Sequence, residues 1–205
     1  MAIHPRTPVI IGVGQITDRP TPRANYLERP EPLDLMVSAL ERALDDTGAA
    51  ALARRALEEI VAVGSFTWHP HDPALLVAQR LGISPRTRLT PTGGNIPQKL
   101  VHQTALRILS GDVDLVAVVG SEAMHAASLA RKAGAKPNWT LQGDDVARPE
   151  LVEEDRVPFT AEEYTNGLTQ PVDVYPLFEN ARRARLGWSI NHQRERLGEL
   201  WHNFA

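Results

Sequence analysis

Hydrophobic positions along residues 8–121 alternate between short continuous apolar runs and longer stretches with helical spacing. The runs that predict strands are Val9–Gly14, Ile60–Phe66 and Leu115–Gly120, and a further short strand is expected over 86–91. Short segments rich in β-branched residues and bounded by glycine or proline are typical of buried strands. The run 115–120 is apolar on both faces, which indicates a strand in a parallel sheet covered by helices on both sides.

Helical spacing separates these runs. Apolar residues at Leu33, Met36, Val37, Leu40 and Leu44 predict an amphipathic helix that ends near Gly48. Further helices are expected over roughly 50–58, 73–82 and 96–110, with Asp72 as an N-cap and Pro73 in the first turn. Strands that alternate with helices make βαβ units, so the predicted fold class is α/β, with a mostly parallel sheet, helices on both faces and right-handed crossovers.

The pattern weakens after Met124. Residues 134–176 mix glycine, proline, acidic residues and isolated aromatics, and helical spacing returns at about 160–166 and 177–204. We expect no strand beyond residue 121. The chain is therefore predicted to contain an α/β domain over 1–125 and a mainly helical excursion over 126–205.

Composition removes several classes of protein and site. The 205 residues contain no cysteine, which excludes disulfides, thiolate metal sites and a thiol nucleophile. The net charge of −3 lacks the basic excess that nucleic-acid binding requires. No apolar run approaches the about 18 residues of a membrane span, and the N-terminus lacks the features of a signal peptide, so a cytoplasmic location is expected.

Two local motifs are interpreted as structural. Gly12-Val13-Gly14 follows a predicted strand, but the third glycine of a dinucleotide-binding motif would fall at Thr17, and no helix begins there. We interpret Gly12-Val13-Gly14 as a tight turn at the end of the strand. His69, His71 and Asp72 lie close together, but a metal ion would need a further converging ligand, so they are interpreted as surface or packing residues with no metal site.

Three other features could contact a ligand. The turn Gly93-Gly94-Asn95 precedes the helix expected over 96–110, so its backbone N–H groups and the helix N-terminus suit an oxyanion, although Pro97 is equally compatible with a structural helix start. His125 follows the end of a predicted strand, where α/β folds place their catalytic and binding residues. The alternative is that His125 lies at the start of a helix and has no functional role. Arginines and tryptophans over 178–201 suit either a phosphorylated ligand or a solvated helix face.

Two passages resemble the thiolase family. Residues 8–17 are similar to the first thiolase strand, and residues 106–124 are similar to the helix–strand–Glu-x-Met passage that follows the thiolase nucleophile. The resemblance is to the sterol-carrier-protein type branch, in particular to actinobacterial thiolase-like proteins of the acetyl-CoA acetyltransferase type. It covers most of 8–125, and over 134–205 it rests on placing the family's loop domain, which contacts coenzyme A in thiolases. It implies the N-terminal half of a thiolase fold, without the last strand of that half.

The resemblance also implies where the family's chemistry would lie. Counted back from Gly111-Asp112, the position of the acyl-accepting cysteine falls at Gly94, and the family's Cys-x-Ser-Gly pattern reads Gly94-Asn95-Ile96-Pro97. Glycine cannot carry an acyl group, so at most its backbone N–H would serve as an oxyanion donor. The catalytic histidine and second cysteine of thiolases belong to a C-terminal half that this chain does not contain, which leaves His125 as a speculative catalytic residue.

Three functions remain open. The first is a thiolase-like protein that binds acyl-CoA, needs no cofactor beyond the coenzyme A ester as its ligand, and is not a competent thiolase alone. The second is a thiolase-fold aldolase that acts on β-hydroxyacyl-CoA, for which Tyr164, Tyr175 and His125 are candidates. The third is a non-catalytic binding or assembly module. The expected partners are an acyl-CoA and a second polypeptide or C-terminal half that completes the fold; a homodimer is a further option.

Overall fold

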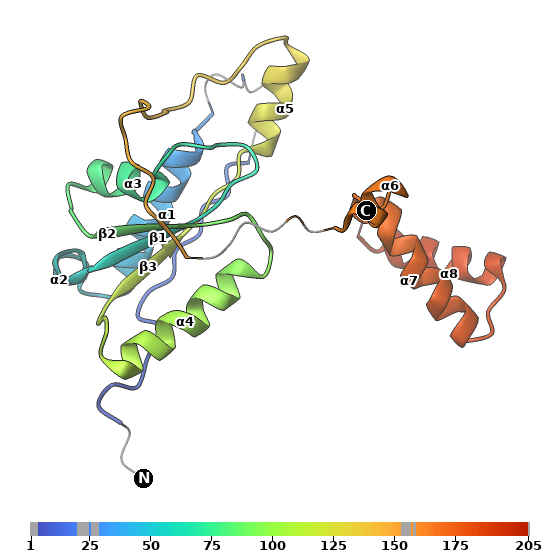
Figure 1. Ribbon diagram of the computed structural model, residues 1–205, viewed down its shortest axis with the longest axis horizontal. Coiled ribbons are helices and arrows are strands. Elements are labelled where there is room, and N and C mark those ends of the chain that lie inside the picture. Colours follow the sequence, from blue (N-terminus) through green and yellow to red (C-terminus); the bar gives the residue numbers. More distant parts are fainter. Residues whose placement is uncertain (1–3, 20–24, 26–28, 153–156, 158, 205) are drawn as a thin grey trace. The chain divides into compact units, whose positions relative to one another are not determined.

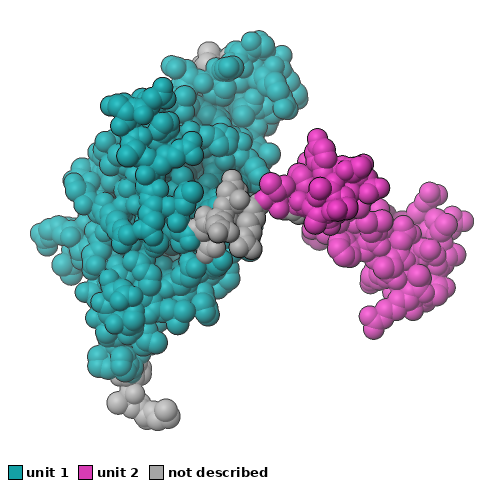
Figure 2. All heavy atoms as spheres, in the orientation of Figure 1, with its two compact units in different colours: residues 1–155 teal, residues 156–205 magenta. Residues whose placement is uncertain are grey.

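The computed structural model describes all residues except 1–3, 20–24, 26–28, 153–156, 158 and 205. The chain forms two compact units, residues 1–155 and 156–205 (Figure 2). The domain boundary predicted after residue 125 falls inside the first unit. Residues beyond that point return to it, because the Trp68 indole donates a hydrogen bond to the Thr140 carbonyl at 2.7 Å and the Asp72 N–H donates one to Gln142 Oε1 at 2.7 Å.

Unit 1, residues 1–155, is built on a parallel sheet of four strands in the order β3-β1-β2-β4 (Figure 1). Strands β1 (Glu59–Val63), β2 (Arg86–Thr90) and β3 (Val116–Val119) confirm three of the predicted strands and the α/β class. Strand β4 (Glu150–Leu151) lies where no strand was expected. Its pairing with β2 places it at the edge, and this short pairing does not need a long apolar run.

The buried strand predicted over Val9–Gly14 is wrong. Residues 8–14 are extended but belong to no strand, and the side chains of Val9, Ile10 and Val13 are 67%, 73% and 68% exposed. The backbone instead lies directly against helix α1 (Pro32–Asp46). A Cβ on Gly12 would lie 2.0 Å from the Ala43 carbonyl oxygen, and one on Gly14 would lie 2.0 Å from that of Ala39. The two glycines therefore serve close packing on a helix.

Helices cover both faces of the sheet (Figure 1). Ile60 and Ala62 of β1 pack on one face in a core cluster with residues of α1 and α3 (Pro73–Leu81). Val61 points to the opposite face, where it packs against Ile96 and Leu100 of α4 (Ile96–Ser110). This alternation follows from the period of two residues along a strand. α2 (Ala50–Ala56) connects α1 to β1, and α5 (Met124–Lys132) follows β3.

A buried ion pair fixes α4 to the sheet. Glu59 of β1 is 1% exposed, and Arg107 of α4 donates hydrogen bonds to its two carboxylate oxygens at 2.6 and 3.0 Å. These bonds raise the pKa of the Arg107 guanidinium above its usual range. Arg88 of β2 lies 3.6 Å from Glu59 and donates to Glu150 of β4 at 2.7 Å, and that hydrogen bond lowers the pKa of Glu150.

Unit 2, residues 156–205, contains α6 (Ala161–Thr165), α7 (Pro171–Arg185) and α8 (Ile190–His202). The helix expected over 160–166 is α6, which begins with a capping box between Thr160 and Glu163. The stretch expected over 177–204 is divided between α7 and α8 at Gly187, whose φ of +67° ends the first helix. Throughout the described part of the chain, no helix is both long and apolar enough to span a bilayer.

Replacing Arg107 by methionine is expected to lower the free energy of unfolding by about 3 kcal/mol, because it leaves the Glu59 carboxylate buried without its main partner. Arg55→Met removes an exposed arginine from α2 and should change stability by less than about 0.5 kcal/mol. Urea unfolding followed by circular dichroism measures both values. Equal midpoints for the two variants would contradict the structural role of the ion pair.

Gly12→Ala is expected to loosen residues 8–14 from α1, because the new methyl group overlaps the Ala43 carbonyl. The Val13 N–H donates to the Asp46 carboxylate at 2.9 Å and reports this contact. Its hydrogen exchange, measured by NMR, should accelerate about tenfold or more. Gly198→Ala, at a glycine with open space around it, is the control and should leave this amide unchanged. An unchanged Val13 amide in Gly12→Ala would refute the packing role.

Candidate functional site

The carboxyl ends of β1, β2 and β3 lie at the same edge of the sheet, because all three strands are parallel. Open α/β sheets bind ligands at this edge. Here β1 continues into residues 64–68, β2 into 91–95 and β3 into 120–123. These three loops form the candidate site.

Glu122 joins the loops after β3 and β1. Its carboxylate accepts a hydrogen bond from the Phe66 N–H at 2.5 Å and one from the Thr67 hydroxyl at 2.9 Å. The buried Ser65 hydroxyl accepts a hydrogen bond from the Thr67 N–H at 3.1 Å, which folds the same loop back on itself. Sequence reasoning missed this role of Glu122, although its place directly after a predicted strand was a signal.

The loops after β1 and β2 are also in contact. The Thr92 hydroxyl donates to the Ser65 carbonyl at 3.4 Å. A Cβ on Gly64 would lie 2.8 Å from the Thr90 carbonyl oxygen, closer than real Cβ contacts allow, so the two strand ends approach each other through a glycine. Hydrogen bonds and a close backbone approach therefore join the three loops to one another.

Gly94 lies on the turn that leads into α4. It is exposed, its φ is not in the left-handed region, and a Cβ built on it would meet no atom within 4 Å. Among the residues that the structure describes, no hydrogen bond of its N–H is present. The turn precedes a helix of 15 residues, whose N-terminus carries a partial positive charge. Position 94 is thus open to a ligand or to a side chain.

His125 lies in a different place. It is an exposed residue of α5 and lines a small cavity of about 190 Å³ together with Ile16–Asp18, Arg29 and Glu122. Gly94 is not part of that cavity. The structure therefore does not bring the two predicted site residues into one pocket, and the catalytic assignment of either stays a prediction.

Of the two histidines near residue 70, His69 is exposed and His71 has a local structural partner. His71 Nδ1 lies 2.8 Å from the Val146 carbonyl. Asp72 caps α3, as predicted, by accepting a hydrogen bond from the Leu75 N–H at 2.8 Å, and it accepts another from the Thr87 hydroxyl at 2.5 Å. Within the described ranges, no group of three or more His, Asp or Glu residues is placed to hold a metal ion.

In unit 2, the arginines and tryptophans over 178–201 are exposed or half-buried, and their contact with a phosphorylated ligand stays a prediction. The Arg182 guanidinium lies over the Trp188 ring at 5.5 Å, which is a cation–π contact within the unit. Trp201 does not pack inward, because it is 66% exposed. Tyr164 and Tyr175 also belong to this unit and His125 to unit 1, so the three aldolase candidates do not form a cluster within either unit.

No protein-family model matches the chain, and neither does any curated protein. A solved structure does match, the monomeric SCP2-thiolase-like protein type 1 from Mycobacterium smegmatis, with 28% sequence identity and a TM-score of 0.68. The match covers 97% of this chain and 34% of that chain, so the chain spans about a third of the length of the solved protein. The resemblance found in the sequence is thereby confirmed: the chain is thiolase-like and has the mixed α/β fold of an SCP2-thiolase-like protein.

Proposed function

We propose that this chain binds an acyl-CoA ester at the strand-end site and does not itself catalyse cysteine-dependent thiolysis. The proposal rests on the open backbone position at Gly94. It occupies the position at which the sequence resemblance puts the family's nucleophile, and it has open space and an N–H without a partner among the described residues. The fold similarity supports a thiolase-like use of this edge of the sheet.

The geometry at Gly94 suits the carbonyl oxygen of a thioester. A backbone N–H at the start of a helix is a hydrogen-bond donor in a region of positive potential, which favours an oxygen that carries partial negative charge. The absence of a side chain leaves room for the ligand at this position. The same absence removes the atom that would take over the acyl group, so no acyl-enzyme forms here.

Glu122 acts in this proposal as a positioning residue. Both of its carboxylate oxygens accept hydrogen bonds from the loop after β1, which holds Phe66 and Thr67 in place. A carboxylate used in this way keeps the rim of the site rigid. Among the described residues, the N–H groups of the Gly93-Gly94 turn remain for a ligand, because the Thr67 hydroxyl already donates to Glu122.

Isothermal titration with acetyl-CoA, on material of verified mass, tests the proposal. We expect saturable binding of one ligand per chain and no thiolysis of acetoacetyl-CoA above the uncatalysed rate. Gly94→Leu places a side chain over the turn N–H, beginning at a Cβ that would meet no atom within 4 Å, and it should weaken binding about tenfold, which is the loss of one good hydrogen bond. Gly198→Leu on α8 is the matched control.

Three outcomes would overturn the proposal. Absence of any binding of acetyl-CoA would favour an assembly module. Thiolysis well above background would show that a glycine at position 94 does not abolish the family's reaction. Retro-aldol cleavage of a β-hydroxyacyl-CoA would assign the aldolase function instead.

Gly94→Cys introduces a thiol at a position where a Cβ would meet no atom within 4 Å, in a chain that has no other cysteine. The nearby N-terminus of α4 stabilises the thiolate, so the thiol pKa should be lower than in Gly198→Cys by about one unit. The rate of alkylation by iodoacetamide as a function of pH measures both values. Identical pH profiles would contradict the positive potential that the proposal places at this turn.

A further inference from the structure

The small cavity at the start of α5 combines polar and aliphatic walls. Its volume is about 190 Å³. An apolar cavity of about 150 Å³ holds one benzene molecule, so this cavity has room for a ligand of about six to eight heavy atoms. Its walls include Ile16, Asp18, Arg29, Leu35, Glu122 and Met124.

Arg29 has a hydrogen-bond donor that the folded chain does not use. The side chain is 8% exposed, and its Nη2 pairs with the Asp18 carboxylate at 2.5 Å and donates to the Asp18 carbonyl at 3.2 Å. The other terminal nitrogen, Nη1, is buried and has no hydrogen-bond partner among the described residues. Buried donors of charged groups are nearly always paired in folded proteins. Because Arg29 lines the cavity, the missing acceptor is expected to come from a ligand bound there.

The first turn of α5 adds backbone donors at the same cavity. This helix of nine residues has Ala123 as its N-cap, which supplies no capping side chain. Within the described ranges, no hydrogen bond of the N–H groups of Met124, His125 and Ala126 is present. All three residues line the cavity. An uncapped helix N-terminus carries a partial positive charge and favours a carboxylate.

Glu122 supplies the opposite charge. Its side chain is exposed, and its carboxylate accepts hydrogen bonds from the Phe66 N–H and the Thr67 hydroxyl. Neither donor carries a charge, and a carboxylate has further acceptor sites for other donors. Glu122 can therefore also pair with a cationic group of a ligand, whereas the charge of Asp18 is balanced by Arg29.

The remaining wall is aliphatic. Ile16, Leu35 and Met124 line the cavity, and the Met124 side chain is 61% exposed beside it. A methionine adapts its shape to an apolar group. The cavity thus offers an unused guanidinium donor, a carboxylate and an apolar surface in one small volume. A molecule with a carboxylate, an ammonium group and a short aliphatic side chain complements all three.

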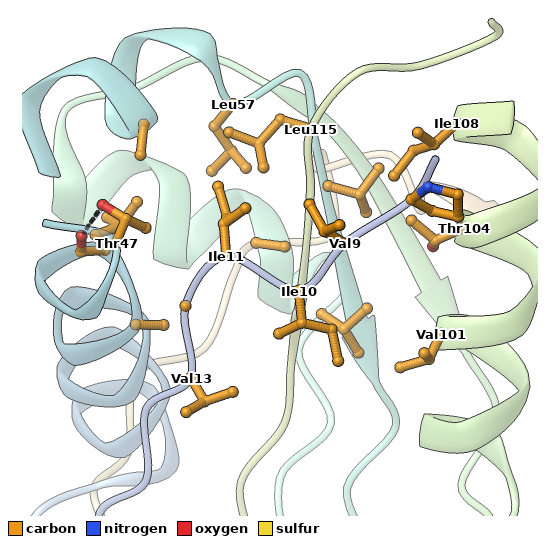
Figure 3. Close-up of a pocket in the computed structure, with 18 of the residues that line it drawn as sticks. Val9, Ile10, Ile11, Val13, Thr47, Leu57, Val101, Thr104, Ile108 and Leu115 are labelled. Atoms are coloured by element: carbon orange, nitrogen blue, oxygen red, sulfur yellow. Dashed lines mark hydrogen bonds between the residues drawn. The ribbon is translucent and has the colours of Figure 1, made fainter. Parts of the chain in front are cut away.

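The larger cavity of unit 1, of about 770 Å³, lacks this combination. Figure 3 shows its largely aliphatic walls, with Ile10 of the N-terminal segment and Ile108 of α4. The arginine in its lining, Arg6, donates to the Ile108 and Val113 carbonyls at 2.7 and 3.2 Å. The same guanidinium pairs with Asp114 at 2.6 Å. A charged ligand therefore finds an unused cationic donor in the small cavity and not in the large one.

Two simpler ligand classes complement fewer of these groups. A carboxylic acid without an ammonium group would use Arg29 but would add a second negative charge close to Glu122, and a phosphate group would add still more charge. A metal ion would have to break the Arg29–Asp18 pair, and in the part of the chain that the structure describes no group of three or more His, Asp or Glu residues is placed to hold one.

We infer that this cavity binds a small aliphatic α-amino acid, with the ligand carboxylate at Arg29 Nη1 and the start of α5, its ammonium group at Glu122, and its side chain on the aliphatic wall. The inference does not depend on acyl-CoA binding, because Gly94 is not part of the cavity.

Titration of the isotope-labelled chain with L-valine, followed by amide chemical shifts, tests the inference. We expect saturable shifts at Ile16–Asp18 and at Met124–Ala126, which line the cavity. Isovalerate is valine without the ammonium group, and isobutylamine is valine without the carboxylate. Each should bind about tenfold more weakly or worse, because each loses one charge-assisted contact.

Arg29→Lys keeps a cation for Asp18 but removes Nη1, so it should weaken valine binding about tenfold or more. Met124→Glu, at an exposed position, should also weaken binding because it adds a negative charge at the carboxylate end of the ligand. Leu52→Glu is the matched control: Leu52 is 60% exposed and does not line the cavity, so valine binding should not change.

The inference fails if valine causes no saturable shifts around the cavity. It also fails if isovalerate binds as tightly as valine, which would remove the ammonium group from the site. Valine binding that is unchanged in both Arg29→Lys and Met124→Glu would place the ligand elsewhere. Titration of the same samples with acetyl-CoA reports the strand-end site separately, so that a failure of one proposal is not taken for a failure of the other.

Discussion

The burial of β1 on both faces and its pairing on both edges is the constraint on which the rest of unit 1 depends. Ile60 and Ala62 pack against α1 and α3, while Glu59 and Val61 face α4. The Glu59–Arg107 ion pair fixes α4 along the sheet, and the helix in turn places the Gly93-Gly94 turn at its start. The loop that continues β1 supplies Ser65, Phe66 and Thr67. The packing of a single strand thus determines where the candidate site lies.

Position 94, where the sequence resemblance puts the family's nucleophile, has no side chain to carry an acyl group. Binding a thioester requires donors for its carbonyl oxygen and a surface for the rest of the ligand, and the open turn at Gly94 offers the first. Acyl transfer requires in addition a nucleophile and a base. Because the two requirements rest on different atoms, a thiolase-like fold can keep ligand binding without the reaction, and this separation is what the proposed function describes.

Local signals predicted the elements well. Helical spacing and caps placed α1, α3 and α4, and the N-cap role of Asp72 follows from its position before Pro73. The error at Val9–Gly14 has a physical cause: an apolar β-branched run shows that a segment needs a partner, but not whether that partner is present. The two-residue strand β4 has no pattern of its own, because its place comes from pairing with β2 and from the ion pair of Glu150 with Arg88.

The candidate site was predicted only in part, since its contacts join residues that are far apart in the sequence. The resemblance pointed to Gly94, but the role of Glu122 depends on hydrogen bonds to residues more than fifty positions away. A titration of the isotope-labelled chain with acetyl-CoA, followed by amide chemical shifts, tests the account most directly. We expect shifts that centre on Ser65–Thr67 and Gly93–Asn95 and leave residues 8–14 unchanged. Shifts confined to residues outside the strand-end loops would contradict it.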